Sequence, residues 1–162
     1  MLLGGRGEMA QTNIHTIDYI TGHHALNLPC ELSTCGDWHT SALRWDMPFI
    51  RNTADSIFGE YGIEKNKRIP ESESVYYVAN HIRAILDLLE IDRLTVAQGM
   101  RDDYICNDNY NGELFNQVIK LTAVPHWNKI DDLMKKEYKS HWLDYKEEIF
   151  NGRLENTPRR SY

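Results

Sequence analysis

The chain has 162 residues, 41% of them hydrophobic and 26% charged, and a formal net charge of -6 at pH 7. This size fits one domain with one core, and no apolar run approaches the roughly 18 residues that span a bilayer. The negative charge argues against binding to free DNA or RNA, which requires an extended cationic surface, and favours a basic protein as a partner.

Both ends of the chain are expected to lie outside the folded domain. Residues 1–12 are Gly-rich and aperiodic, which predicts a disordered extension, and Met9 is an alternative start to Met1. The apolar residues at the start are too few for the core of a secretory signal, so a cytoplasmic location is expected. Residues 151–162 predict a flexible tail, which leaves 13–150 as a single domain.

The N-terminal half is predicted to consist of short strands joined by loops. Apolar and polar residues alternate over 14–20, which indicates a strand that ends at Gly22. Pro29 interrupts the segment 25–32 and removes a backbone donor there. That segment is therefore expected to be an edge strand or a loop.

Turn-forming residues recur from 33 to 70, which predicts a loop-rich region with short strands. Within it, a hairpin is expected between 57–58 and 61–69. In this hairpin Ile63 faces the core and Glu64 faces water.

The second half of the chain shows the 3.6-residue periodicity of amphipathic helices. The strongest pattern predicts a helix over about 75–91, with Ser72 or Ser74 as the N-terminal cap. Arg83 and Asp87 fall on the side opposite the apolar stripe, so both are expected to face water.

Further helices are expected after this one. A short helix over 94–97 is followed by Gly99, which can end it in the left-handed conformation, and another helix begins at Asn111. The last helix, over 126–150, would be about 37 Å long at 1.5 Å per residue. The predicted fold is therefore α+β, with a small N-terminal β/loop-rich portion packed on a C-terminal bundle of about four helices.

The segment 23–45 concentrates the side chains that carry chemistry. Asp37 can orient the imidazole of His39, Trp38 offers a flat surface for a ligand, and His23 supplies a second imidazole. His39, Asp37 and His23 are therefore the candidate catalytic residues. The more ordinary interpretation makes Asp37 a turn residue, Trp38 a packed side chain and His39 a partner of the backbone.

The three cysteines, unevenly spaced, predict reduced thiols in a reducing compartment. Cys30, Cys35 and His39 could instead present two thiolates and an imidazole to a zinc ion, with His23 or His24 as the fourth ligand. The two-residue gap of a zinc knuckle is missing, so buried free thiols are the favoured interpretation. No cofactor is expected, and zinc is the only one that these residues suggest.

Aromatic side chains are the candidate anchors for a partner, namely Trp38, Trp127, Tyr138, Trp142 and Tyr145. The leading hypothesis is a non-enzymatic protein that binds and neutralises or regulates another protein, in the manner of an antitoxin, an immunity protein or a defence-accessory protein. A second copy of the chain is another candidate partner. The alternative is a small metal-dependent or His/Asp-dependent enzyme that acts on a nucleotide or nucleic acid. Phosphate-binding and common hydrolase motifs are absent, so the sequence leans away from an enzyme.

Overall fold

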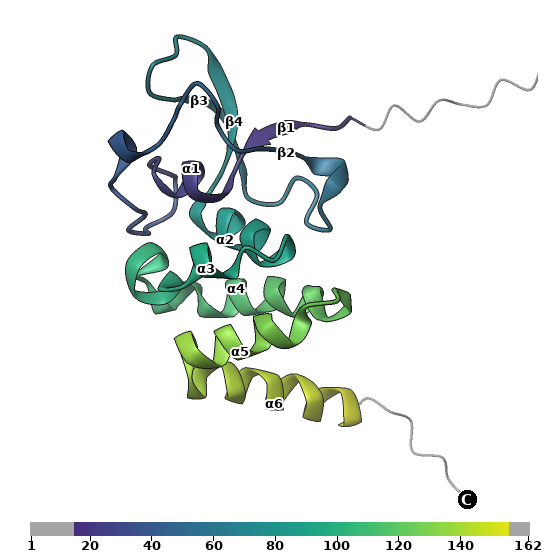
Figure 1. The fold of residues 1–162 in the computed structure, drawn as a ribbon. Coiled ribbons are helices and arrows are strands. Elements are labelled where there is room, and N and C mark those ends of the chain that lie inside the picture. The colour runs from purple at the N-terminus through teal and green to yellow at the C-terminus, as the bar shows by residue number, and fades with distance from the viewer. Residues whose placement is uncertain (1–14, 156–162) are drawn as a thin grey trace, which may run out of the picture.

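In the computed structural model, which describes residues 15–155, the sheet and the first α-helix lie at one end of the molecule and the other α-helices are stacked beyond them (Figure 1). The strands are β1 (Asp18–Ile20), β2 (Ile50–Asn52), β3 (Ile63–Arg68) and β4 (Val75–Ala79). Their order is β2-β1-β4-β3. β1 runs parallel to β4, whereas β2 and β3 are antiparallel to their neighbours. The predicted α+β fold is confirmed.

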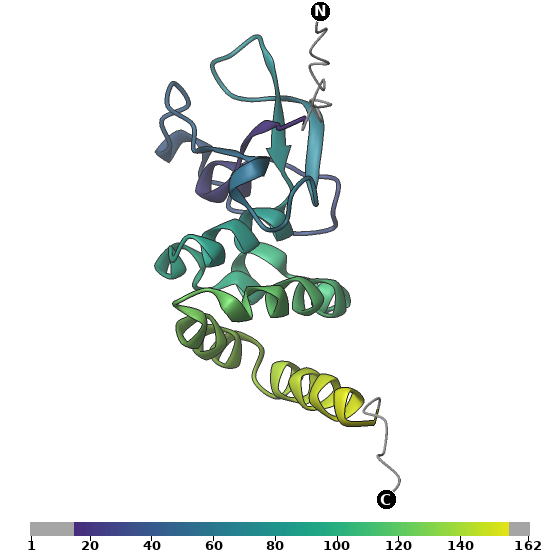
Figure 2. The ribbon, with the colours of Figure 1, turned by 90° about the vertical axis from the view of Figure 1, so that its right-hand side faces the viewer.

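The helices are α1 (Gly22–Leu26), α2 (His81–Glu90), α3 (Leu94–Ala97), α4 (Asn111–Val118), α5 (Trp127–Tyr138) and α6 (Ser140–Glu155). α2 is the central element, because it contacts α1, β4, α3 and α4. Figure 2 shows α6 at the end farthest from the sheet. No helix within residues 15–155 is long and apolar enough to cross a membrane.

The boundaries of the domain differ in part from the predicted ones. α6 continues to Glu155, past the expected end at 150. The predicted extension 1–12, the choice of start and the last residues of the predicted tail, 156–162, lie outside the described residues. The structure therefore does not test these predictions.

The predicted helix over 75–91 is divided into a strand and a helix. β4 takes the first five residues, whose β-branched and aromatic side chains favour a strand and which pair with β3 and β1. Asn80 then caps α2, since its side chain accepts a hydrogen bond of 2.8 Å from the amide of Arg83. The prediction of a cap at Ser72 or Ser74 is wrong because strand pairing extends up to the cap at Asn80.

The N-terminal predictions are also corrected. Within the described part of the strand predicted over 14–20, only Asp18–Ile20 forms β1, and residue 14 lies outside the described residues. The segment expected to follow as an edge strand or loop begins with the helix α1. β3 pairs with β4 and not with 57–58. Glu64 is buried, whereas the hairpin prediction had it facing water. Its carboxylate accepts a hydrogen bond of 2.8 Å from the amide of Glu31, which accounts for its place inside the fold.

Arg83 and Asp87 are completely buried, contrary to the prediction that they face water. The Asp87 carboxylate accepts four hydrogen bonds, from the hydroxyls of Tyr19 and Thr21, each at 2.7 Å, and from the guanidinium groups of Arg51 and Arg83, at 2.9 and 3.0 Å. A buried charge is tolerated when it is paired and fully hydrogen-bonded. This network ties α2 to β1 and β2.

The predicted helix over 126–150 is two helices, α5 and α6, separated at Lys139, where φ is 54°. Lys146 in α6 donates to the carboxylate of Asp131 in α5 at 2.8 Å. In one straight helix these residues would lie roughly 22 Å apart along the axis. The chain therefore reverses, and Trp142 is fully buried against Phe115, with ring centres 5.2 Å apart.

Candidate functional site

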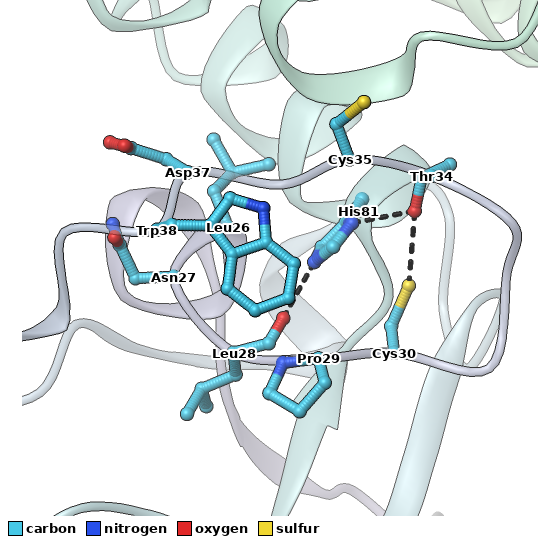
Figure 3. A pocket seen from close by; sticks show the side chains of 10 residues that line it. All are labelled: Leu26, Asn27, Leu28, Pro29, Cys30, Thr34, Cys35, Asp37, Trp38 and His81. Carbon is cyan, nitrogen blue, oxygen red and sulfur yellow. Dashed lines mark hydrogen bonds between the residues drawn. The ribbon is translucent and has the colours of Figure 1, made fainter.

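A pocket of about 220 Å³ lies between the loop after α1 and the N-terminal end of α2 (Figure 3). Its apolar walls are Leu26, Leu28, Pro29 and the ring of Trp38, and its polar side chains are Asn27, Cys30, Thr34, Asp37 and His81. Sites for drug-sized ligands have volumes of roughly 300–1,000 Å³. This pocket is smaller, so it fits a single ring or a short chain.

Gly36 allows the loop to close over the pocket. Its φ is +68°, and a Cβ there would lie 2.7 Å from Cε1 of His81 and 2.8 Å from the carbonyl oxygen of Leu26. Its amide donates to the carbonyl of Tyr104 at 2.9 Å, and the next amide, of Asp37, donates to Leu26 at 2.7 Å. Only glycine fits both the backbone conformation and this close approach.

Three predicted catalytic residues converge beside the pocket, where Asp37 is one of its lining residues, and we call them the acid–base cluster: His23, Asp37 and His39. One oxygen of Asp37 lies 3.0 Å from Nε2 of His23, and its other oxygen is hydrogen-bonded to Nδ1 of His39. A carboxylate only accepts, so each imidazole donates to Asp37 through the nitrogen that contacts it. Burial raises the pKa of Asp37, but the hydrogen bonds from His39 and His23 outweigh burial and lower it, so Asp37 is ionised at neutral pH.

Asn27 positions both histidines, although the sequence analysis did not identify it. Its amide nitrogen donates to the carbonyl of His23 at 2.9 Å, and its carbonyl oxygen accepts from the backbone amide of His39 at 2.8 Å. Asn27 is buried and lies at the C-terminal end of α1. A buried asparagine that spans two chain segments is recognisable only once the loop is folded back.

A second set of polar groups lines the interior of the pocket, and we call it the thiol relay: Cys30, Thr34 and His81. The Thr34 hydroxyl lies 3.4 Å from the Cys30 sulfur and 2.6 Å from Nδ1 of His81 (Figure 3). Nε2 of His81 is 2.6 Å from the carbonyl oxygen of Leu28, so this nitrogen carries a hydrogen. The sequence analysis did not identify Thr34 or His81 as site residues, because no local signal links them to Cys30.

The pKa values of the thiol relay are shifted toward a thiolate and an imidazolium. Burial raises the pKa of Cys30, but His81 and the Thr34 hydroxyl outweigh it and lower that pKa. Burial lowers the pKa of His81, but hydrogen bonding to Cys30 and to the Leu28 carbonyl, with the charge of Glu64, raises it above its ordinary value. Both shifts favour transfer of a proton from sulfur to the imidazole.

The predicted zinc ligands are not brought together. Cys35 forms a disulfide with Cys106, 71 positions along the chain, so the prediction of three reduced cysteines is wrong. Cys30 and Cys35 both line the pocket, but Figure 3 shows the Cys35 sulfur directed away from Cys30. Within residues 15–155 no group of three or more His, Cys, Asp or Glu side chains is arranged to hold a metal ion. Because the disulfide consumes one thiolate, Cys30, Cys35 and His39 do not form the predicted site.

His24, the other predicted zinc ligand, has a structural role. Its Nε2 lies 3.0 Å from the carbonyl oxygen of Arg44, and its Nδ1 accepts from the amide of Phe49 at 3.2 Å. Both ring nitrogens are therefore used within the fold.

The predicted partner-binding residues are mostly interior. Tyr138 and Trp142 are fully buried, and Trp127 and Tyr145 are partly buried against the same core. Trp38 is the exception, since it is 80% exposed and lies beside the acid–base cluster. The aromatic stripe therefore packs the helices together and does not form an exposed surface.

A second, smaller pocket of about 150 Å³ lies on the other side of His23. Its residues include His23, Phe49 and Arg93, whose guanidinium lies 5.3 Å from the centre of the Phe49 ring. Asp37 lines the first pocket and His23 lines the second, and the two are hydrogen-bonded. The hydrogen bond between Asp37 and His23 thus links the two pockets, and His39 lines neither of them.

Both pockets and the acid–base cluster are built by the N-terminal half of the chain and α2, with Arg93 and Val96 contributed from just beyond α2. Protein-family models, curated proteins and solved structures were compared with the chain, and none of them matches it.

Proposed function

We propose that this protein is an enzyme that performs acid–base chemistry on a small nucleotide, with the acid–base cluster as its reaction centre. The observation that carries the proposal is one ionised carboxylate that lines the first pocket and is hydrogen-bonded to two imidazoles, one of which, His23, lines the second pocket. Such a pair can accept a proton at one ring and donate a proton at the other, which a hydrolytic reaction requires.

The exposure of the two rings suggests their roles. The His39 side chain is 78% exposed and that of His23 is 43% exposed. In the proposed reaction, Nε2 of His39 takes a proton from an attacking water, whose oxygen bonds to phosphorus. The bond from phosphorus to the leaving oxygen breaks, and this oxygen takes the Nδ1 proton of His23, which enters the reaction as the imidazolium with its Nε2–H donating to Asp37. Asp37 holds His39 in the tautomer whose Nε2 can accept a proton, and its charge offsets the positive charge on whichever ring carries the additional proton.

The walls of the two pockets support a nucleotide as the substrate. Trp38 presents an exposed indole face on which a base can stack, and the first pocket accepts one ring. Arg93 lines the second pocket, and in the part of the chain that the structure describes it has no ion-pair partner. A guanidinium suits a phosphate group. The net charge of -6 disfavours long nucleic acids, so a mononucleotide or short oligonucleotide fits better.

The non-enzymatic hypothesis has less support. It was based on the acidic charge, one long aromatic-rich helix and the lack of a coherent catalytic set, and that helix is folded back with Tyr138 and Trp142 in the core. An antitoxin-like role, a protein partner and self-association remain predictions. So does the cytoplasmic location, and the disulfide is a bond typical of oxidising compartments.

The substrate class is tested by titrating the full-length protein with the four mononucleotides and with the matching nucleosides. Binding is monitored by tryptophan fluorescence and by the NMR resonances of the imidazole rings. We expect Trp38→Ala to weaken binding of both classes by about 5- to 150-fold, because base stacking contributes about 1–3 kcal/mol. Arg93→Gln should weaken binding of nucleotides but not of nucleosides. Phe150→Ala, which removes an exposed aromatic ring far from the pocket, is the control. Absence of nucleotide binding, or equal effects of Trp38→Ala and Phe150→Ala, would contradict the proposal.

Catalysis is tested with phosphate mono- and diesters of the nucleotide that binds. We expect His39→Gln and His23→Gln each to lower kcat by about 10²-fold, the lower end of the usual range for general acid–base groups, because both rings are partly exposed. Binding of the nucleotide should change little in either variant. Turnover that both variants retain would rule out the cluster as the reaction centre.

A further inference from the structure

Cys30 is the free cysteine left when Cys35 and Cys106 are joined, since the chain has three cysteines. It is partly exposed, it lines the first pocket, and it is hydrogen-bonded into the thiol relay. The acid–base chemistry proposed above does not use it. A thiol at the wall of a cavity, linked through a hydroxyl to a buried imidazole, is an arrangement suited to nucleophilic chemistry.

We propose that Cys30 is a nucleophilic thiol that accepts an acyl group from an activated ester or thioester entering the pocket, with His81 taking the thiol proton through the Thr34 hydroxyl. This proposal does not depend on the nucleotide chemistry, because it uses different residues and a different reaction.

The direction of the relay follows from hydrogen-bonding capacity. Nε2 of His81 donates to the carbonyl of Leu28, so Nδ1 of the neutral ring has a lone pair. The Thr34 hydroxyl, 2.6 Å away, donates to this nitrogen and accepts from the Cys30 thiol at 3.4 Å. When the hydroxyl proton moves to Nδ1, the thiol proton can replace it on oxygen. The result is a Cys30 thiolate and a His81 imidazolium.

The surrounding charges favour this ion pair. The charge of Glu64, on β3, helps to raise the pKa of His81 and so stabilises the imidazolium. It is held in place by the amide of Glu31 at 2.8 Å and by an ion pair with Lys67 at 2.9 Å. Asp37 lines the same pocket, but its carboxylate is already hydrogen-bonded to two histidines of the acid–base cluster. A carboxylate that stabilises the imidazolium also favours the thiolate, because the imidazolium is the counterion of the thiolate.

The proposed step balances without another reactant. The thiolate attacks the carbonyl carbon of the acyl donor, a carbon–sulfur bond to Cys30 forms, and the bond from that carbon to the leaving alcohol or thiol breaks. The leaving group takes the proton that His81 holds, returned through Thr34. The apolar walls, among them Leu26 and Leu28, suit a short acyl chain or a single ring.

The first experiment measures alkylation of the unreduced full-length protein by iodoacetamide from pH 5 to pH 10, followed by intact mass. One label per chain is expected, because the disulfide leaves only Cys30. The rate should have its inflection below the pKa of about 8.5 of an ordinary thiol. In Thr34→Val and in His81→Gln the inflection should move up, and Thr34→Ser should restore it. The nucleophilicity of a thiolate falls as the pKa of its thiol falls, so a thiol with tenfold more thiolate is alkylated only about threefold faster. The pH of the inflection, and not the alkylation rate, is therefore the decisive measurement.

The second experiment supplies p-nitrophenyl acetate to the same protein. A burst of nitrophenolate equal to the concentration of chains is expected, with acetyl found on the peptide that contains Cys30, and Cys30→Ser should abolish both. An inflection of the unmodified protein at or above about 8.5 would overturn the relay, whatever the variants do. Fast alkylation without acetylation would overturn the acyl-transfer step. Neither assay contains a nucleotide, so a negative result here does not contradict the proposed function. A negative result in the nucleotide experiments likewise does not contradict the acyl transfer to Cys30.

Discussion

Replacing Asp87 by alanine is expected to lower the free energy of unfolding by about 3–5 kcal/mol. The carboxylate accepts hydrogen bonds from two hydroxyls and two guanidinium groups inside the protein. Without it, the charge of Arg83, which is fully buried, has no counterion, while Arg51 keeps only Glu90. An uncompensated buried charge is more costly than a lost surface contact. Urea unfolding followed by circular dichroism measures the change.

Asp46→Ala is the matched control for this prediction. Asp46 also pairs with an arginine, Arg44, but both groups are exposed to solvent. The unfolding midpoint of this variant should equal that of the wild type, because exposed ion pairs contribute little. If Asp87→Ala unfolded at the same midpoint as Asp46→Ala, the buried network would not be what holds α2 to the sheet.

Opening the disulfide between Cys35 and Cys106 is expected to destabilise the protein by about 4 kcal/mol, because a bond that closes a long loop restricts the unfolded chain. The two residues are 71 positions apart, so the closed loop contains nearly half of the chain. The bond also ties the pocket loop to the segment Met100–Ile105, beside the hydrogen bond from Gly36 to Tyr104. Its loss should therefore loosen the pocket as well. Thermal unfolding with and without reductant measures the effect.

The double variant Cys35→Ser/Cys106→Ser should match the reduced wild type and should not respond to reductant. Cys30→Ser removes the remaining thiol and should respond to reductant as the wild type does. A wild-type protein whose melting temperature stays the same while mass analysis shows the bond reduced would contradict the prediction.

Some elements were predictable because their signals are local. The helix that begins at Asn111 and the short helix before Gly99, whose φ is +82°, were both predicted, and both are present. Turn and cap preferences depend on a few neighbouring residues, so they can be interpreted without the fold. The acid–base cluster was predictable for a related reason: Asp37 and His39 are two positions apart, and His23 lies in the same polar segment.

Other features depend on contacts between distant segments. Val75–Ala79 has apolar residues at a spacing that also suits a helix, but pairing with β1 and β3 makes it a strand. Arg83 and Asp87 have the spacing of a solvent-facing pair, and only the surrounding hydroxyls and Arg51 make their burial favourable.

The sequence by itself therefore determined the fold class, several helix ends and the polar segment that holds His23, Asp37 and His39, because cap, turn and periodicity preferences act over a few residues. Only the tertiary structure decided that the last helix turns back at Lys139, that Cys35 bonds to Cys106, and that Thr34 and His81 meet Cys30. The physical reason is that these contacts join residues far apart in the sequence, which meet only when the chain folds. His81 lies 47 positions after Thr34, and no periodicity or spacing of residues encodes such a contact.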